Sequence, residues 1–181
     1  MGNNIDAIIL FERAKYMELK GREIISLPIL DESSGKDLGE VKNLIYDLHN
    51  KKLTALIIED GGWLWGKNII YLKDIETIGK DVVIILSADI IICTAQDSEA
   101  KKLTRDFYDL IGNKVITQSG KDLGIIEDII FEVDTGEITG LEISNGILAD
   151  LIDGRSEIAF PQDIVLGDQS IIVGESIVNR Q

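Results

Sequence analysis

The chain repeats the hexapeptide Ser34-Gly35-Lys36-Asp37-Leu38-Gly39, without a single change, at residues 119–124. Apolar positions further along are copied at the same offset of 85 residues: Val41 and Ile126, Ile45 and Ile130, Leu56 and Leu141, Ile58 and Ile143. Self-similarity at a fixed period is typical of an internal duplication. The 181 residues therefore divide into two copies of one unit, each of about 75–90 residues.

The two copies stay recognisable to their ends, although the offset changes. Asp74-Ile75 matches Asp163-Ile164, and residues 79–85 match residues 167–173 after a drift of three or four residues. A drift of this kind indicates that loops differ in length between the copies.

Short runs rich in β-branched residues fill both copies and predict strands. The runs are 24–25, 56–58, 69–71, 82–85 and 90–92 in the first copy, and 114–117, 124–133, 137–144, 155–160 and 170–173 in the second. The hexapeptide suits a tight turn that opens a strand. Its glycines, Gly35 and Gly39 in the first copy and Gly120 and Gly124 in the second, can adopt backbone angles that strain other residues.

One segment between the copies predicts a helix. Residues 97–108 are polar, and apolar residues fall at positions 100, 103, 107 and 110, a spacing that suits a short amphipathic helix capped by Asp97 or Ser98. We therefore expect an all-β chain in three parts: a first unit with an N-terminal extension over residues 1–95, a helical connector over 96–109, and a second unit over 110–181. Many short strands without strand–helix alternation favour two small antiparallel sheets or barrels.

The charge is strongly negative and uneven. The net charge is −14, and residues 96–181 carry 17 acidic and 7 basic side chains. Such a surface repels polyanions, so direct binding of nucleic acid is disfavoured, whereas a basic protein partner is compatible with it. The alternative is that the acidity only keeps the protein dispersed.

Cysteine content and hydropathy indicate the compartment. Cys93 is the only cysteine, so no internal disulfide can form, and the longest apolar stretch, residues 82–93, is too short and too interrupted for a membrane helix. No secretory signal pattern opens the sequence. We expect a cytoplasmic protein with no membrane span.

Residues suited to chemistry are few. Asp134-Thr135-Gly136 resembles the aspartic-protease tripeptide, but the first copy has His49-Asn50-Lys51 there, so a hairpin turn is favoured. His49 is the only histidine, which excludes multi-histidine metal sites. Carboxylates gather at residues 31–32 and 127–128 without the spacing of a calcium loop. We expect no catalytic residue, no cofactor and no metal site.

Both tryptophans lie in one glycine-bounded segment, residues 61–66. Trp63, Leu64 and Trp65 have no aromatic counterpart in the second copy, where the sequence reads Gly-Ile-Leu-Ala. Large aromatic side chains are enriched among binding hot spots. We expect these three residues to contact a partner, with sealing of the core or of a junction as the alternative.

The order of these motifs resembles the PRC-barrel family. Each copy has a Gly-x-x-Leu-Gly-x-Val or Gly-x-x-Leu-Gly-x-Ile turn, an acidic residue closing the next strand and a late Asp-Ile element, preceded in the second copy by Phe160-Pro161. The resemblance covers about residues 19–175 and implies two six-stranded PRC-barrel-like β-barrels in tandem. The family includes the cytoplasmic part of the photosynthetic reaction-centre H subunit and a ribosome maturation factor, and its common theme is protein–protein docking.

The sequence therefore predicts a non-enzymatic protein–protein adaptor or assembly module. Its partner is a protein, for which a basic one would fit, and the sequence is also compatible with a homo-oligomer. A first alternative is a protein that responds to a small ligand or metal cation in a cleft between the barrels. A second is an accessory factor of ribosome or RNA processing that acts through a basic protein.

Overall fold

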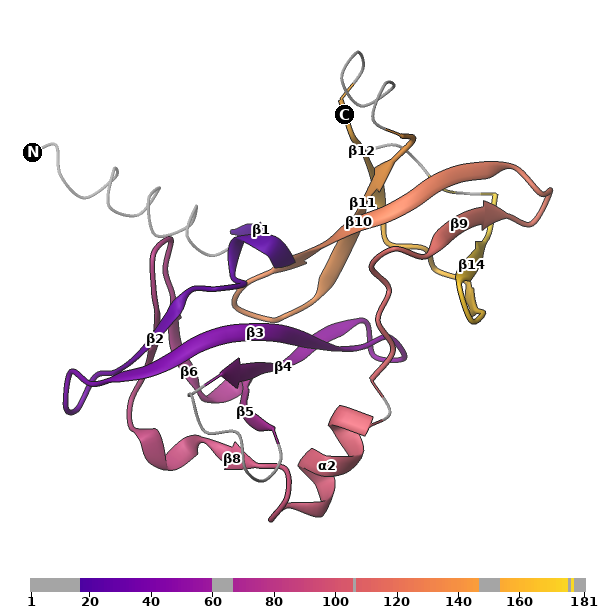
Figure 1. Ribbon diagram of the computed structural model, residues 1–181. Coiled ribbons are helices and arrows are strands. Elements are labelled where there is room, and N and C mark those ends of the chain that lie inside the picture. Colours follow the sequence, from indigo (N-terminus) through magenta and orange to yellow (C-terminus); the bar gives the residue numbers. More distant parts are fainter. Residues whose placement is uncertain (1–16, 60–66, 106, 147–153, 176, 178–181) are drawn as a thin grey trace, which may run out of the picture. The chain divides into compact units, whose positions relative to one another are not determined.

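The computed structural model describes residues 17–59, 67–105, 107–146, 154–175 and 177 (Figure 1). The chain forms two compact units: the first comprises residues 1–108 together with the short segment Glu132–Glu137, and the second comprises residues 109–131 and 138–181. The described part is mostly β, with one short α-helix between two β-sheet domains, which confirms the predicted fold class. No helix in these residues is long and apolar enough to cross a membrane.

The first unit is built on one sheet with the strand order β6-β7-β2-β3-β4-β5-β8. Its strands are β2 (Pro28–Asp31), β3 (Asp37–Asp47), β4 (Lys52–Glu59), β5 (Asn68–Tyr71), β6 (Ile75–Ile78), β7 (Val83–Ile85) and β8 (Ile92–Cys93). The unit also contains β1 (Glu18–Lys20), the helix α2 (Ser98–Arg105), and 3-10 turns at Gly21–Glu23, Leu72–Asp74 and Ala88–Ile90.

The second unit repeats this sheet with the order β13-β14-β9-β10-β11-β12. Its strands are β9 (Lys114–Thr117), β10 (Asp122–Glu132), β11 (Ile138–Ser144), β12 (Ser156–Ala159), β13 (Ile164–Leu166) and β14 (Ser170–Val173). The six strands correspond one to one, and in the same order, to β6, β7, β2, β3, β4 and β5. The duplication inferred from the sequence is thus a duplication of one sheet.

The sheets are mixed rather than purely antiparallel, which corrects the expectation from the sequence. β2 pairs with β7 in parallel, and β9 pairs with β14 in parallel, whereas the other ladders are antiparallel. The cause is topological, because the last hairpin of each copy returns to lie beside that copy's first strand. Periodicity within a strand carries no information about the direction of a distant neighbour.

The hexapeptide forms a turn followed by a bulge in both copies. The φ angles are +68° at Gly35, +110° at Gly39, +85° at Gly120 and +116° at Gly124. Between each glycine pair an aspartate carboxylate accepts a hydrogen bond from the second glycine: Asp37 from Gly39 and Asp122 from Gly124, both at 2.9 Å. Repetition of the sequence therefore coincides with repetition of a backbone shape that favours glycine.

Two further bulges recur at equivalent positions of the long strands. The register shifts between Val41 and Asn43 on β3, and between Ile126 and Asp128 on β10. Asn43 and Asp128 each accept a hydrogen bond at 2.8 Å from the next backbone N–H. Each long strand also shifts register a second time, after Ile45 and after Ile130. Bulges bend and twist a strand, so both copies curve in the same way.

A bulge also explains part of the drift in the repeat. On β6 the register shifts between Ile75 and Thr77, whereas β13 runs from Ile164 to Leu166 without a shift. Glu76 is therefore one extra residue in the first copy. The offset changes by one residue at this point inside a strand, and not in a loop as we expected.

Helix α2 packs on the first unit. Leu103 and Phe107 contact a buried cluster that contains Ile45, Ala55, Ile57, Ile69 and Ala100. Asp97 caps the helix by accepting a hydrogen bond at 2.7 Å from the backbone N–H of Ala100. The segment that the sequence marks as a connector thus contributes to the core of one unit, with Ala100 fully buried.

Two of the short apolar runs are not full strands. Ile24 and Ile25 follow a 3-10 turn, and Ile24 is fully buried there. The run 90–92 is divided between a 3-10 turn and β8. Ile24 thus fills the core from irregular backbone, whereas the isoleucines of 90–92 are half-buried. A short apolar run in the sequence therefore does not distinguish a strand from buried irregular backbone.

Candidate protein-interaction sites

The tryptophan segment predicted as the partner contact lies outside the described residues. Trp63, Leu64 and Trp65 fall between β4 and β5, in the gap from residue 60 to residue 66. The residues that flank this segment, Glu59 and Lys67, both form polar interactions with neighbouring elements. Glu59 forms an ion pair of 2.6 Å with Lys42, and Lys67 exchanges hydrogen bonds of 2.9 Å with Thr94 through both its N–H and its C=O. The segment thus begins and ends on anchored strands.

The Asp134-Thr135-Gly136 tripeptide forms the turn between β10 and β11. Glu132 holds this turn, since its carboxylate accepts hydrogen bonds from the N–H groups of Asp134 at 3.2 Å and Thr135 at 2.7 Å, and from the Thr135 hydroxyl. Burial alone would raise the pKa of Glu132, but these hydrogen bonds outweigh it and lower the pKa below the ordinary glutamate value. Such a carboxylate is a poor general base near neutral pH.

The corresponding turn of the first copy uses the same device. Asp47 accepts hydrogen bonds from the N–H of Asn50 at 2.9 Å and from its side-chain amide at 2.7 Å. Burial acts to raise the pKa of Asp47, and the hydrogen bonds with Asn50 and His49 lower it overall. His49 is exposed on the turn. The only histidine of the sequence therefore belongs to a hairpin turn.

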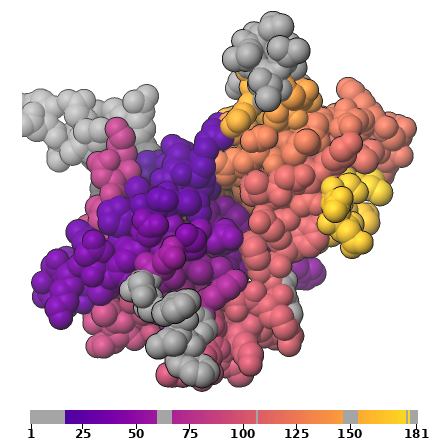
Figure 2. Space-filling model, viewed as in Figure 1, coloured from indigo at the N-terminus to yellow at the C-terminus, as the bar shows by residue number. Residues whose placement is uncertain are grey.

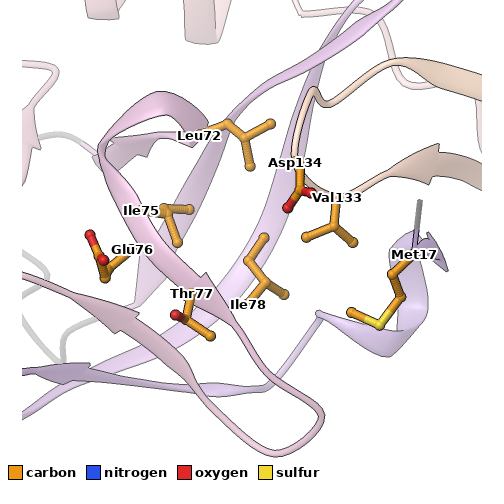
Figure 3. A pocket seen from close by; sticks show the side chains of 8 residues that line it. All are labelled: Met17, Leu72, Ile75, Glu76, Thr77, Ile78, Val133 and Asp134. Atoms are coloured by element: carbon orange, nitrogen blue, oxygen red, sulfur yellow. The ribbon is translucent and has the colours of Figure 1, made fainter. Parts of the chain in front are cut away.

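A shallow pocket of about 260 Å³ lies in the first unit, against β6 (Figure 3). Five apolar side chains line it, with Glu76, Thr77 and Asp134 as the polar ones. Val133 and Ile78 lie close together in the view, whereas Glu76 lies at the opposite side of the pocket from Asp134. The two carboxylates are not arranged as a pair that could share a proton.

A second hollow, of about 360 Å³, lies in the second unit beside the hexapeptide of that copy. Its charged lining residues are Lys121, Asp122 and Glu175. Glu175 accepts a hydrogen bond of 2.7 Å from the N–H of Ser119. The pKa of Glu175 is lowered, first by a hydrogen bond with the Ser119 side chain and then by this bond from the N–H. The hollow thus combines one cation with carboxylates over an apolar floor that includes Ile158.

The carboxylate at residue 31, in one of the two acidic pairs of the sequence, is committed to its own turn. Asp31 is 5% exposed and accepts hydrogen bonds from the Ser33 hydroxyl at 2.6 Å and from the N–H groups of Ser34 and Ala88, each at 3.1 Å. The bond from Ser33 is the main cause of a lowered Asp31 pKa. In the second copy Thr117 takes this place, because its hydroxyl accepts a hydrogen bond of 3.1 Å from the N–H of Lys121.

The carboxylates at residues 127–128 also serve the fold. The Arg155 guanidinium lies 3.4 Å from a carboxylate oxygen of Glu127 and 3.4 Å from one of Glu142, which is buried. Asp128 accepts the bulge hydrogen bond described above. In the part of the chain that the structure describes, no group of three or more His, Cys, Asp or Glu side chains could hold a metal ion.

The sheet order, the repeated glycine turns and the acid-held hairpins agree with a comparison to protein families. The model of the PRC-barrel domain matches the chain twice, over residues 17–90 and 104–176. The chain belongs to the PRC-barrel family. None of the curated proteins matches it significantly.

The two PRC-barrel matches leave out a short stretch between them, residues 91–103. It contains β8 and most of α2, which pack against β5 and the core cluster of the first unit. The first PRC-barrel domain is therefore extended by one strand and one helix that the second lacks in its described residues.

Sequence reasoning did not anticipate the structural work of three side chains in these PRC-barrel domains. The sequence places Asp31 in an acidic pair, Glu132 at a strand end and Arg155 at the start of an apolar run, and none of these positions predicts the hydrogen bonds or ion pairs that they form. A usable signal existed for one of them, since an acidic residue occurs at the same repeat position in both copies, at Asp47 and Glu132. Arg155 and Asp31 have no such repeat.

Proposed function

We propose that this PRC-barrel protein is a non-enzymatic adaptor or assembly module that binds protein partners. The observation that carries the proposal is the use of its acidic side chains. Asp31, Asp47 and Glu132 each accept two or more hydrogen bonds from an adjoining turn and have lowered pKa values. Carboxylates in this state stabilise loops and are poorly suited to accept a proton in a reaction.

The charge supports a basic partner. Residues 109–131 and 138–181 carry 11 acidic and 4 basic side chains, so the second domain presents a negative field that attracts Lys- and Arg-rich surfaces and repels nucleic acid. An accessory role in ribosome or RNA processing through a basic protein is one form of this proposal. Cosedimentation with ribosomal subunits would distinguish that form.

The test is a crosslinked affinity pull-down from a lysate of the native host. Wild type is compared with the double variant Trp63→Ser/Trp65→Ser, shown by circular dichroism to remain folded. The adaptor role predicts a specific protein that wild type captures and the variant loses. Capture of nothing above background by wild type would count against the role.

Small-ligand binding is a second candidate function, favoured by the hollow of about 360 Å³ in the second domain. It predicts that a soluble metabolite or cation raises the midpoint of thermal unfolding. A screen that includes Ca²⁺ and Mg²⁺ tests it, and Lys121→Met, which removes the cation in the lining, should abolish the effect of an anionic ligand but not that of a cation.

A further inference from the structure

Strand β13 is the last strand at one edge of the second domain's sheet, as far as the described residues show. Among the described residues it pairs only with β14, in the register Ile164 with Val173, Val165 with Ile172 and Leu166 with Ile171. The N–H of Gly167 donates to the carbonyl of Ser170 at 2.9 Å and closes the hairpin. Because antiparallel pairs alternate, Val165 directs its backbone groups to β14, whereas Ile164 and Leu166 direct theirs away from the sheet.

This edge is apolar and exposed. Val165 is 61% exposed, Ile172 is 42% exposed and Leu166 is 41% exposed. Val165 and Ile172 are register partners, and Ile172 is in turn paired with Ile116 on β9, so the three β-branched side chains form a row across one face. Figure 2 shows the C-terminal hairpin, in yellow, at the surface.

The same edge of the first domain differs in both respects. Thr77 is the counterpart of Val165, and Ile78, the counterpart of Leu166, is only 6% exposed. β6 also forms one wall of the pocket whose other wall includes Met17 and Val133 (Figure 3). At these two positions the first copy thus has one polar residue and one buried residue, where the second copy has two exposed apolar residues.

Charge specifies what would fit the β13 edge. Asp163 and Asp168 are exposed at the two ends of β13, within a unit of 11 acidic and 4 basic side chains. A second copy of this chain would bring the same carboxylates together, and like charges placed in this way are destabilising. An extended segment with apolar residues at its centre and lysine or arginine at both ends would complement the edge.

We propose that β13 is a docking edge for such a segment of a partner protein, which adds to the sheet as one more strand. The backbone groups of Ile164 and Leu166 supply hydrogen bonds, and the row of Val165, Ile172 and Ile116 supplies apolar contact. Asp163 and Asp168 select basic ends about 17 Å apart, the length of five residues in a strand. This inference deepens the proposed adaptor function and depends on it.

The test uses the full chain and two synthetic peptides, Lys-Lys-Thr-Val-Thr-Val-Thr-Lys-Lys and the same peptide with glutamate in place of lysine. Binding is measured by fluorescence anisotropy, and the contacted amides are identified by NMR. We expect the lysine peptide to bind, to perturb the amides of Ile164 and Leu166, and to weaken as salt is added. The glutamate peptide should not bind.

Two variants locate the site and one controls for charge. Val165→Lys places a positive charge, the same sign as that of the lysine peptide, at an exposed position. Leu166→Pro removes a backbone N–H that faces away from the sheet, where proline is tolerated. Each variant should lower the affinity for the lysine peptide by about tenfold or more. Thr77→Lys, the matched change in the first domain, should leave this affinity unchanged. Circular dichroism verifies folding, and the highly exposed Val165→Lys remains informative if Leu166→Pro does not fold.

Several results would overturn the proposal: no binding of the lysine peptide, equal binding of the glutamate peptide, or equal loss in Thr77→Lys. A dimer seen by analytical ultracentrifugation and lost in Val165→Lys would instead identify a second copy as the occupant. If a partner is captured through Trp63 and Trp65 but the peptide does not bind at β13, the adaptor function is supported and the docking edge at β13 is rejected.

Discussion

At the scale of single residues, identical sequence does not mean identical surroundings. Gly120 and Gly124 lie in the same hexapeptide and both have positive φ. A Cβ atom at Gly120 would meet open space, whereas one at Gly124 would collide with the carbonyl oxygen of Ser144 and approach Asn145 and Ile143 to 2.8 Å. Backbone strain acts at both positions, and a steric clash acts at only one.

We therefore expect Gly124→Ala to destabilise the protein more than Gly120→Ala. The change at Gly120 should cost about 1–2 kcal/mol from the left-handed backbone alone. The change at Gly124 should cost about 3 kcal/mol or more, because the neighbouring backbone must also move. Chemical denaturation of both variants measures the difference, and equal losses would show that the contact with Ser144 is unimportant.

The carboxylate of Glu132 leads to a pH-dependent prediction. Its pKa is lowered in the folded protein, so its contribution to stability is complete above the unfolded-chain value of about 4.3 and is lost as the pH falls through the folded value. Glu132→Gln should therefore cost about 1 kcal/mol at neutral pH, and the difference from wild type should shrink in acid.

Urea unfolding at pH 7 and in acid measures this difference. The exposed Glu76→Gln is the control and should change the free energy of unfolding by less than about 0.5 kcal/mol. A loss in Glu132→Gln that is the same at both pH values would show that the charge of Glu132 does not hold the turn.

At the scale of elements, helix α2 depends on one cap and one apolar face. Asp97 accepts the hydrogen bond from the N–H of Ala100, and Leu103 packs against the core cluster of the first domain. A helix of eight residues is too short to be stable alone in water. Packing against the sheet, together with the cap, therefore maintains it.

Asp97→Ala should destabilise the first domain by about 1 kcal/mol, the usual effect of removing an N-cap side chain. Ser98→Ala is the matched control, since Ser98 is the neighbouring candidate cap and is exposed. Thermal unfolding followed by circular dichroism compares the two. A larger loss of stability in Ser98→Ala than in Asp97→Ala would show that Ser98, and not Asp97, caps the helix.

At the scale of the whole molecule, the net charge of −14 affects the rate at which charged partners associate with the protein. Attraction between exposed charges is screened over about 10 Å at 0.1 M salt. If the partner is basic, as proposed, its capture should fall steadily as NaCl is raised, mainly through slower association. Pull-downs over a salt series, or association rates once the partner is known, check this, and binding that strengthens with salt would indicate an apolar interface instead.

The sequence alone determined the duplication, the all-β class, the positions of most strands and the helix, with its cap narrowed to Asp97 or Ser98. These follow from local rules: periodicity, β-branched runs, and glycines repeated where the backbone needs positive φ. The Trp63–Trp65 contact stays a prediction from composition. The identical hexapeptides share positive φ at both glycines and the bond from the second glycine to the aspartate, because these features depend on the hexapeptide's own residues.

Only the tertiary structure decided which strands pair in parallel, where Glu76 is inserted, and that α2 belongs to the core of the first domain. It also decided that Asp31 is satisfied by Ser33 and Ala88, and that Val165 and Leu166 on β13 are exposed where Ile78 on β6 is buried. Each of these depends on residues that are distant in the chain but close in space. Local pattern carries no information about such neighbours, because direction and burial are set by the partner strand and not by the strand itself.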